Sequence, residues 1–107
     1  MKKGVTVIPT GIDFEDPRIK NVKMVTDLFA FEDLKASPNF VLKDFKDSHY
    51  IGEVDPEKND RSGNGICIYL NERYYEGSWK KDKWHGKGYE KFSNGNIYFG
   101  DYEQGKV

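Results

Sequence analysis

In the second half of the chain, aromatic and polar residues alternate with the period of a β-strand. Tyr75, Gly77 and Trp79 fall on one face of such a strand, and the residues between them are polar. A polar connection follows at 81–85, and Asn-Gly at 94–95 is a strong hairpin-turn signal because both residues tolerate positive φ. The pattern therefore predicts antiparallel β-hairpins.

The hairpin pattern recurs with a fixed period. The interval from Tyr75 to Tyr98 equals the interval from the Gly-x-Gly of 63–65 to that of 86–88. Only Tyr50 departs from this register, since a slightly longer interval separates it from Tyr75. A fixed period in the range of about 20–50 residues is typical of a repeat array, in which each unit buries its aromatic face against the next.

The order Tyr-x-Gly-x-Trp, then His-Gly-x-Gly, then a turn and the next Tyr resembles the MORN repeat. Tyr75–Ile97 is the close copy, Tyr50–Tyr74 is divergent, and Tyr98–Val107 is expected to contain only the first strand of a third copy. The resemblance implies a mainly β fold, an array of antiparallel hairpins. It also implies a scaffold, dimerisation element or interaction module, and lipid binding has been proposed for some members.

Two acidic residues depart from the repeat pattern. Glu72 occupies the position of the turn glycine in the divergent copy. Glu90 stands where the family usually has an aromatic residue, which predicts a polar contact or a local edge at that position.

The second strand of the divergent copy is apolar on both faces. By register, Ile66, Ile68 and Leu70 lie on the face opposite to Cys67 and Tyr69. A strand of this kind is normally covered on both sides. The sequence therefore predicts a cover over the three aliphatic residues, and leaves open whether the N-terminal segment or another chain provides it.

Composition changes near residue 49. All seven tyrosines and both tryptophans lie at or after Tyr50, so we divide the chain into an arm at 1–49 and an array at 50–107. Asp16-Pro17 is a helix-start signal, and one short helix is expected across 27–36. Five phenylalanines in the arm predict that it becomes ordered by docking.

Composition also limits the class of protein. The net charge of −1 offers no field that would attract nucleic acid, which is not an expected partner. The single Cys67 cannot form an internal disulfide and is expected to be a small core residue. No apolar run approaches the roughly 20 residues of a membrane span. We expect a cytoplasmic protein, and the family resemblance favours the cytoskeleton or a cilium.

The residues that carry chemistry elsewhere form no catalytic or metal pattern here. His49 and His85 have no ligand at metal spacing, and His85 is expected to bond within its hairpin. Asp55, Glu57 and Asp60 are expected to form a solvated turn, because the spacing of a calcium loop is absent. We therefore expect no enzyme activity, no metal and no cofactor.

A basic loop allows two interpretations. Lys80, Lys81, Lys83 and Lys87 surround Trp84, and lysines beside an interfacial tryptophan can bind anionic phospholipid headgroups. Lysines also keep hairpin loops soluble and protect sheet edges. Both interpretations stay open.

The expected function is a non-catalytic scaffold subunit that binds other proteins of a larger assembly, cytoskeletal or ciliary and similar to radial-spoke proteins. The alternative is a phospholipid-binding targeting module like those attached to phosphatidylinositol phosphate kinases, and a third possibility is a regulatory piece of a longer enzyme. The strand at 98–102 is expected to offer an open edge to another protein or, by self-association, to a second copy. The candidate partner-binding residues are Ile66, Ile68, Leu70, Tyr98, Phe99 and Tyr102.

Overall fold

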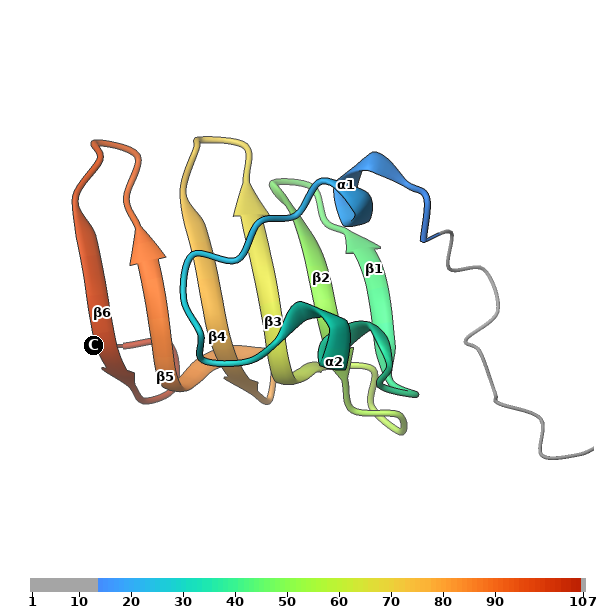
Figure 1. Cartoon of the computed structure of the whole chain (residues 1–107). Helices are drawn as coiled ribbons and strands as arrows, with labels where there is room; N and C mark the ends of the chain where they lie inside the picture. The colour runs from blue at the N-terminus through green and yellow to red at the C-terminus, as the bar shows by residue number, and fades with distance from the viewer. Residues whose placement is uncertain (1–13, 107) are drawn as a thin grey trace, which may run out of the picture.

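The chain folds into one open antiparallel sheet (Figure 1). The computed structural model describes residues 14–106. Six strands lie side by side in chain order, which confirms the predicted mainly β hairpin array. The strands are β1 Phe40–Asp44, β2 Ser48–Val54, β3 Arg61–Tyr69, β4 Tyr74–Lys80, β5 Lys83–Lys91 and β6 Ile97–Tyr102.

The turn between β4 and β5 is tighter than the sequence predicts. Lys81 and Asp82 both have positive φ, 51° and 68°, as in a two-residue hairpin turn whose twist matches the strands. The polar connection predicted at 81–85 is therefore wrong, since β5 already begins at Lys83 and includes Trp84. Polarity misled the prediction because strand ends at the rim of a sheet are as polar as a loop. The turn predicted at 94–95 is confirmed, with Gly95 at φ 92°.

The third copy extends beyond its first strand, contrary to the prediction. Gln104 and Gly105 have φ of 52° and 82°, and they repeat the turn formed by Lys81 and Asp82 one repeat period earlier. The chain then returns far enough for Lys106 to pair with Glu103. The Gly105 N–H donates to the carbonyl oxygen of Trp84 at 2.7 Å, which joins this turn to the preceding hairpin.

The sheet begins before the boundary placed between the segments 1–49 and 50–107. β1 pairs with β2 from Phe40↔Glu53 to Asp44↔His49. Its sequence FVLKD contains none of the tyrosine, tryptophan or glycine on which that boundary was based. Two short helices precede it, α1 Pro17–Lys20 and α2 Phe31–Lys35, so the helix expected across 27–36 is shorter than predicted.

Residues 14–36, called the arm from here on, run across one face of the sheet, which we call the arm face. The segment after α1 crosses to β4, turns, and returns to α2 near β2 (Figure 1). The other face carries most of the aromatic rings and is called the aromatic face.

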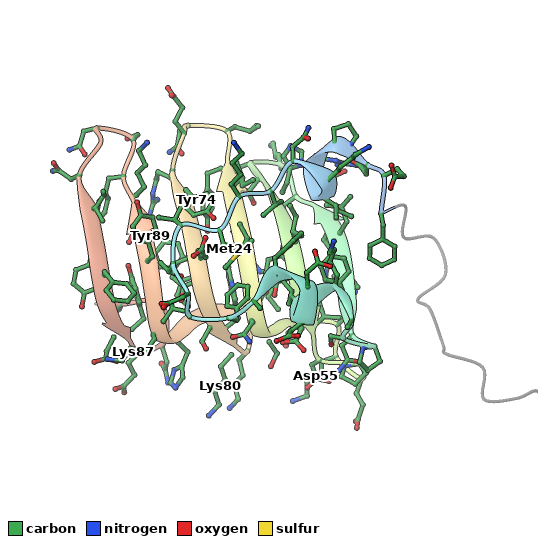
Figure 2. The ribbon with its side chains drawn as sticks, viewed as in Figure 1. Met24, Asp55, Tyr74, Lys80, Lys87 and Tyr89 are labelled. Carbon is green, nitrogen blue, oxygen red and sulfur yellow. The ribbon has the colours of Figure 1, made fainter. Side chains whose placement is uncertain are left out.

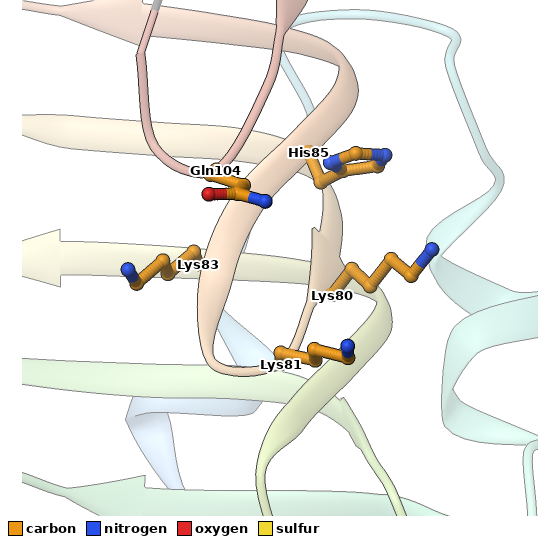
Figure 3. A pocket seen from close by; sticks show the side chains of 5 residues that line it. All are labelled: Lys80, Lys81, Lys83, His85 and Gln104. Atoms are coloured by element: carbon orange, nitrogen blue, oxygen red, sulfur yellow. The ribbon is translucent and has the colours of Figure 1, made fainter.

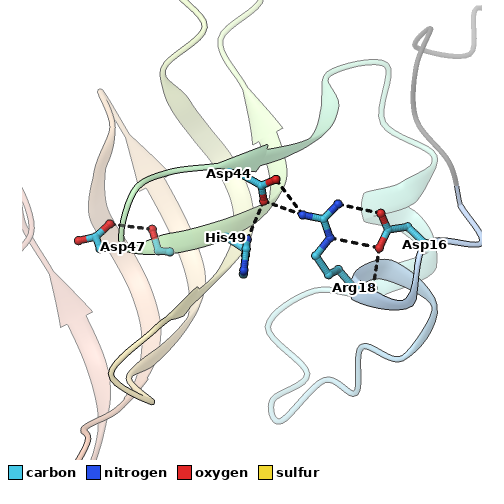
Figure 4. A network of polar contacts seen from close by, with 6 residues as sticks. Asp16, Arg18, Asp44, Asp47 and His49 are labelled. Atoms are coloured by element: carbon cyan, nitrogen blue, oxygen red, sulfur yellow. Dashed lines mark hydrogen bonds and ion pairs between the residues drawn. The ribbon is translucent and has the colours of Figure 1, made fainter.

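Charged groups fasten α1 to the hairpin of β1 and β2 (Figure 4). The Asp16 carboxylate accepts from Arg18 N at 2.9 Å, and the Arg18 guanidinium donates to Asp44 at 2.7 Å. Hydrogen bonding to Arg18 lowers the pKa of Asp16 to about 2. Hydrogen bonds from His49, 2.6 Å away, and then from Arg18 also lower the pKa of Asp44.

Each face of the sheet has its own core. Aromatic and small apolar residues form the first, which comprises Tyr50, Val54, Cys67, Tyr75, Trp79 and Tyr102. The second lies between arm and sheet and comprises Ile19, Leu34, Phe40 and Ile51. A single-layer sheet has two faces to bury, and here the repeats fill one and the arm covers part of the other.

Candidate interaction surfaces

The aromatic face is built from tyrosine rings that lie over glycines. The Tyr75 hydroxyl donates to the carbonyl oxygen of Ser78 at 2.8 Å, and a Cβ atom at Gly88 would lie 2.4 Å from that hydroxyl. Tyr50 lies over Gly65 in the same way, with a corresponding distance of 2.3 Å. Only glycine allows this close approach. The tyrosine of one strand and the last glycine of Gly-x-Gly on the returning strand therefore form a packing unit across each hairpin.

Both tryptophans pack into the aromatic face. Trp79 is 4% exposed and meets Tyr50 and Tyr75 edge-on, with ring centroids 5.1 and 5.2 Å apart. Trp84 stacks on Tyr75 at 4.6 Å, nearly parallel to it. Trp84 is thus a half-buried packing residue rather than the loop residue that the sequence suggests, because the turn before it is short.

Glu90 makes the polar contact predicted for it. Its carboxylate is 2% exposed and accepts from Arg73 Nη2 at 2.7 Å and from the Tyr102 hydroxyl at 3.0 Å. Burial, and then the hydrogen bond to Glu90, raise the pKa of Tyr102. Partners on both sides compensate for burying this charge.

Three of the predicted lysines lie together at the β4–β5 turn. Lys80, Lys81 and Lys83 line a cavity of about 220 Å³ with His85 and Gln104 (Figure 3). Sequence reasoning missed the last two. Gln104 could have been found, since it follows Lys81 by one full repeat period. The His85 side chain makes no hydrogen bond within residues 14–106, contrary to the bond expected in its hairpin.

Lys87 is the remaining lysine of the predicted set, and it does not line this cavity. It pairs with Asp101 on β6 at 2.9 Å, and both side chains are exposed. The structure therefore divides the predicted lipid-binding set into a lysine pocket, a surface ion pair and a packed tryptophan.

The predicted cover over β3 is the arm. Ile66 is fully buried, whereas Ile68 is 37% and Leu70 69% exposed. The sequence left two candidates for the cover, and the N-terminal segment is the one found. The arm crosses β3 away from the β3–β4 turn (Figure 1), and Leu70 beside that turn stays in solvent.

The three predicted partner-binding residues of β6 lie on different faces. Tyr102 is buried in the aromatic face, 5.3 Å from the half-buried ring of Tyr98. Phe99 is on the arm face and is 58% exposed. The six candidates therefore do not form one surface, and burial leaves mainly Ile68, Leu70 and Phe99 open to contact.

Glu76 anchors the arm, a role that sequence reasoning missed. Its side chain is fully buried and accepts hydrogen bonds from the backbone N–H groups of Val25 at 2.9 Å and Thr26 at 2.7 Å. The hydroxyls of Thr26 and Tyr74 also donate to it. Strand alternation places Glu76 on a polar face, and no signal in the sequence shows that the arm crosses there.

Other classes of site find no support among the described residues. No group of three or more His, Cys, Asp or Glu in residues 14–106 could hold a metal ion. No helix in the same range is long and apolar enough to cross a membrane.

A scan against protein-family models matches residues 75–97 to the MORN repeat. The matched segment contains almost all of β4, all of β5, and the start of β6. It coincides with the close copy recognised from the order of tyrosine, glycine, tryptophan and histidine.

Proposed function

Because the chain contains a MORN repeat, we propose that it is a non-catalytic interaction module, a scaffold subunit that binds other proteins through its sheet. The main support is the distribution of exposed apolar residues. Within residues 14–106, five large apolar residues are exposed. They are Val25 on the arm and Ile68, Leu70, Ile97 and Phe99 on or beside strands. Ile97 and Phe99 share one face of β6, and an exposed apolar patch on an ordered surface is typical of a protein-binding site.

Three carboxylates, the buried Glu76 and Glu90 and the half-buried Asp82, take part in contacts that stabilise the fold. Glu76 holds the arm, Glu90 pairs with Arg73, and Asp82 pairs with Arg61 at 2.7 Å. Each of these carboxylates has a partner within the fold. These pairings hold the arm, the strands and the β4–β5 turn together, which is the use that the proposal assigns to them.

The proposal is tested by native purification of the tagged chain at its natural expression level, followed by light scattering and cross-linking. We expect a complex of defined mass, with stoichiometric partner proteins cross-linked to the sheet. Recovery of the full chain as a free monomer, with no stoichiometric partner, would contradict the proposal. The finer suggestion of a cytoskeletal or ciliary assembly rests on the family resemblance and is tested by the identity of those partners.

A second candidate function is binding to anionic phospholipid, and the lysine pocket favours it. Three lysines and His85 line a cavity of about 220 Å³, and clustered lysines attract anionic headgroups. The lysine side chains are exposed, and salt screens such charges beyond about 8 Å at physiological ionic strength. We therefore rank this function second.

Sedimentation with acidic vesicles at physiological salt separates the two functions. The scaffold proposal predicts little binding by the wild-type chain. Strong sedimentation that is lost when Lys80, Lys81 and Lys83 are changed to Gln, with the fold intact, would reverse the ranking.

A further inference from the structure

The arm face contains the same pair of positions twice. Ile66 and Glu76 are neighbours in the β3–β4 register, and both are fully buried where the arm crosses. One repeat period later, Tyr89 and Phe99 are neighbours in the β5–β6 register. The second repeat therefore presents the position that receives the arm in the first.

In the second repeat the arm does not cover this position. The arm turns back at β4, where Val25 bonds to Glu76, and leaves β5 and β6 open (Figure 1). Phe99 and Ile97 are each 58% exposed. Tyr89 is half-buried and lies beside Tyr74, with ring centroids 6.1 Å apart, at the rim of the arm (Figure 2).

The open position also differs from the covered one in charge. Lys87 and Lys91 stand where the first repeat has Asn64 and Ile68. Strand alternation places both lysines on the arm face, where Asp101 is the acidic residue contributed by β5 and β6. Lys87 pairs with Asp101 at 2.9 Å, so Lys91 supplies the excess positive charge. The surface is therefore apolar at its centre and weakly basic at its sides.

We propose that this surface, the second-repeat platform formed by Lys87, Tyr89, Lys91, Ile97 and Phe99, binds an acidic segment of a partner protein that carries apolar anchors. The arm shows that this face accepts an irregular chain segment, and the lysines select for acidic residues beside the anchors. The inference rests on the proposed interaction function and specifies its face and the chemistry of its partner.

The arm of a second copy fits the platform less well. Docking of the arm depends on the Glu76 carboxylate, which binds two backbone N–H groups. Phe99 occupies the equivalent position and cannot accept those bonds. The arm also carries five acidic and four basic residues, so it lacks the charge that would complement the lysines.

Selection from a display library of short random peptides tests the proposal on the full chain. We expect enriched peptides to combine Asp or Glu with aromatic or aliphatic residues. Their affinity should fall about tenfold in Phe99→Glu, which removes the central anchor and adds a repelling charge. Lys91→Glu should weaken them several-fold, and added salt should do the same.

Two variants serve as matched controls. Leu70→Glu changes another exposed apolar residue outside the platform, and Lys23→Glu changes an exposed lysine on the arm. Both should leave peptide affinity unchanged, and circular dichroism should show that all four variants are folded.

Several outcomes would overturn the inference. These are failure to select any peptide, selection of basic peptides, and affinity that Phe99→Glu does not change. If the chain binds phosphatidylserine vesicles and the Phe99→Glu variant does not, the platform is a membrane-binding surface. A dimer abolished by that change would assign it to a second copy. If partner proteins copurify equally with wild type and Phe99→Glu, the platform fails while the interaction function stands.

Discussion

The two faces of the sheet are packed by different means. On the aromatic face, Tyr50 and Tyr75 lie over the glycines of their own hairpins, and Trp79 fills the space between the two rings. On the arm face, a segment distant in sequence covers Ile66 in the first repeat and leaves Phe99 in the second exposed. One face is thus built by contacts that recur along the chain, and the other by a single docking event.

This difference assigns the stability of the sheet mainly to the aromatic face and partner binding to the arm face. A repeated contact contributes to the sheet in every copy, so changing it should weaken the whole array. A docked arm can be lost while the sheet persists, because its short helices depend on tertiary contacts. The four predictions that follow test this separation, in order of decreasing effect.

Replacement of Trp79 by Ala should have the largest effect. Its ring is buried between two tyrosines, and deleting a buried tryptophan costs about 3–5 kcal/mol of unfolding free energy. Trp84→Ala should cost less, about 2 kcal/mol, because Trp84 is half-buried and loses mainly its stack on Tyr75. Urea unfolding measures both values, and a smaller loss for Trp79 than for Trp84 would contradict the packing described here.

Glu76→Gln should detach the arm from the sheet while the packing of the aromatic face stays intact. The amide can accept only through one oxygen, so it cannot satisfy all the donors of Val25, Thr26 and Tyr74, and we expect a loss of about 2–3 kcal/mol. Hydrogen exchange should accelerate in the arm. The control is Glu90→Gln, a buried carboxylate on the aromatic face, which should destabilise the chain without selective exchange in the arm. Equal hydrogen exchange in the arms of the two variants would contradict the anchoring of the arm by Glu76.

Glu72→Gly should stabilise the chain by about 0.5–1 kcal/mol, because Glu72 has φ 72°, a left-handed conformation. That conformation costs a residue with a Cβ about 1–2 kcal/mol, partly offset by the greater freedom of glycine when unfolded. Thermal or urea unfolding gives the change. Glu57→Gly, at an exposed glutamate outside the positive-φ residues, is the control and should be neutral or destabilising. A loss of stability at Glu72 would show that its side chain outweighs the strain.

Lowering the pH should weaken the attachment of α1 to the β1–β2 hairpin, and this is the smallest of the four effects. The folded-state pKa of Asp16, about 2, lies below its ordinary value of 3.8, and that of Asp44 is also lowered. Their pairing with Arg18 therefore contributes stability above about pH 4, and this contribution disappears as the pH falls towards 2. The difference in stability between wild type and Arg18→Gln should be present at neutral pH, shrink below about pH 4 and vanish below pH 2. A difference that grows on acidification would contradict this assignment.

The sequence by itself determined the repeated half of the structure. The spacing of Tyr75, Gly77 and Trp79 specifies a strand with one aromatic face, and the turn at 94–95 specifies where it reverses. These features are local, since each depends on residues of one hairpin and its neighbour. The polar contact of Glu90 could be predicted for the same reason, because the aromatic residue expected by the repeat is missing there.

Only the tertiary structure decided which residues of the arm face are covered and which are exposed. Alternation places Glu76 and Phe99 on the same face one period apart, but it does not say that the first is buried and the second exposed. Burial there depends on where the arm crosses and turns back, at a point far from β4 in the sequence. The arm's apolar residues follow no single period that would fix its path. Contacts of this range are selected by the shape and chemistry of the assembled sheet, which exists only once the hairpins have paired.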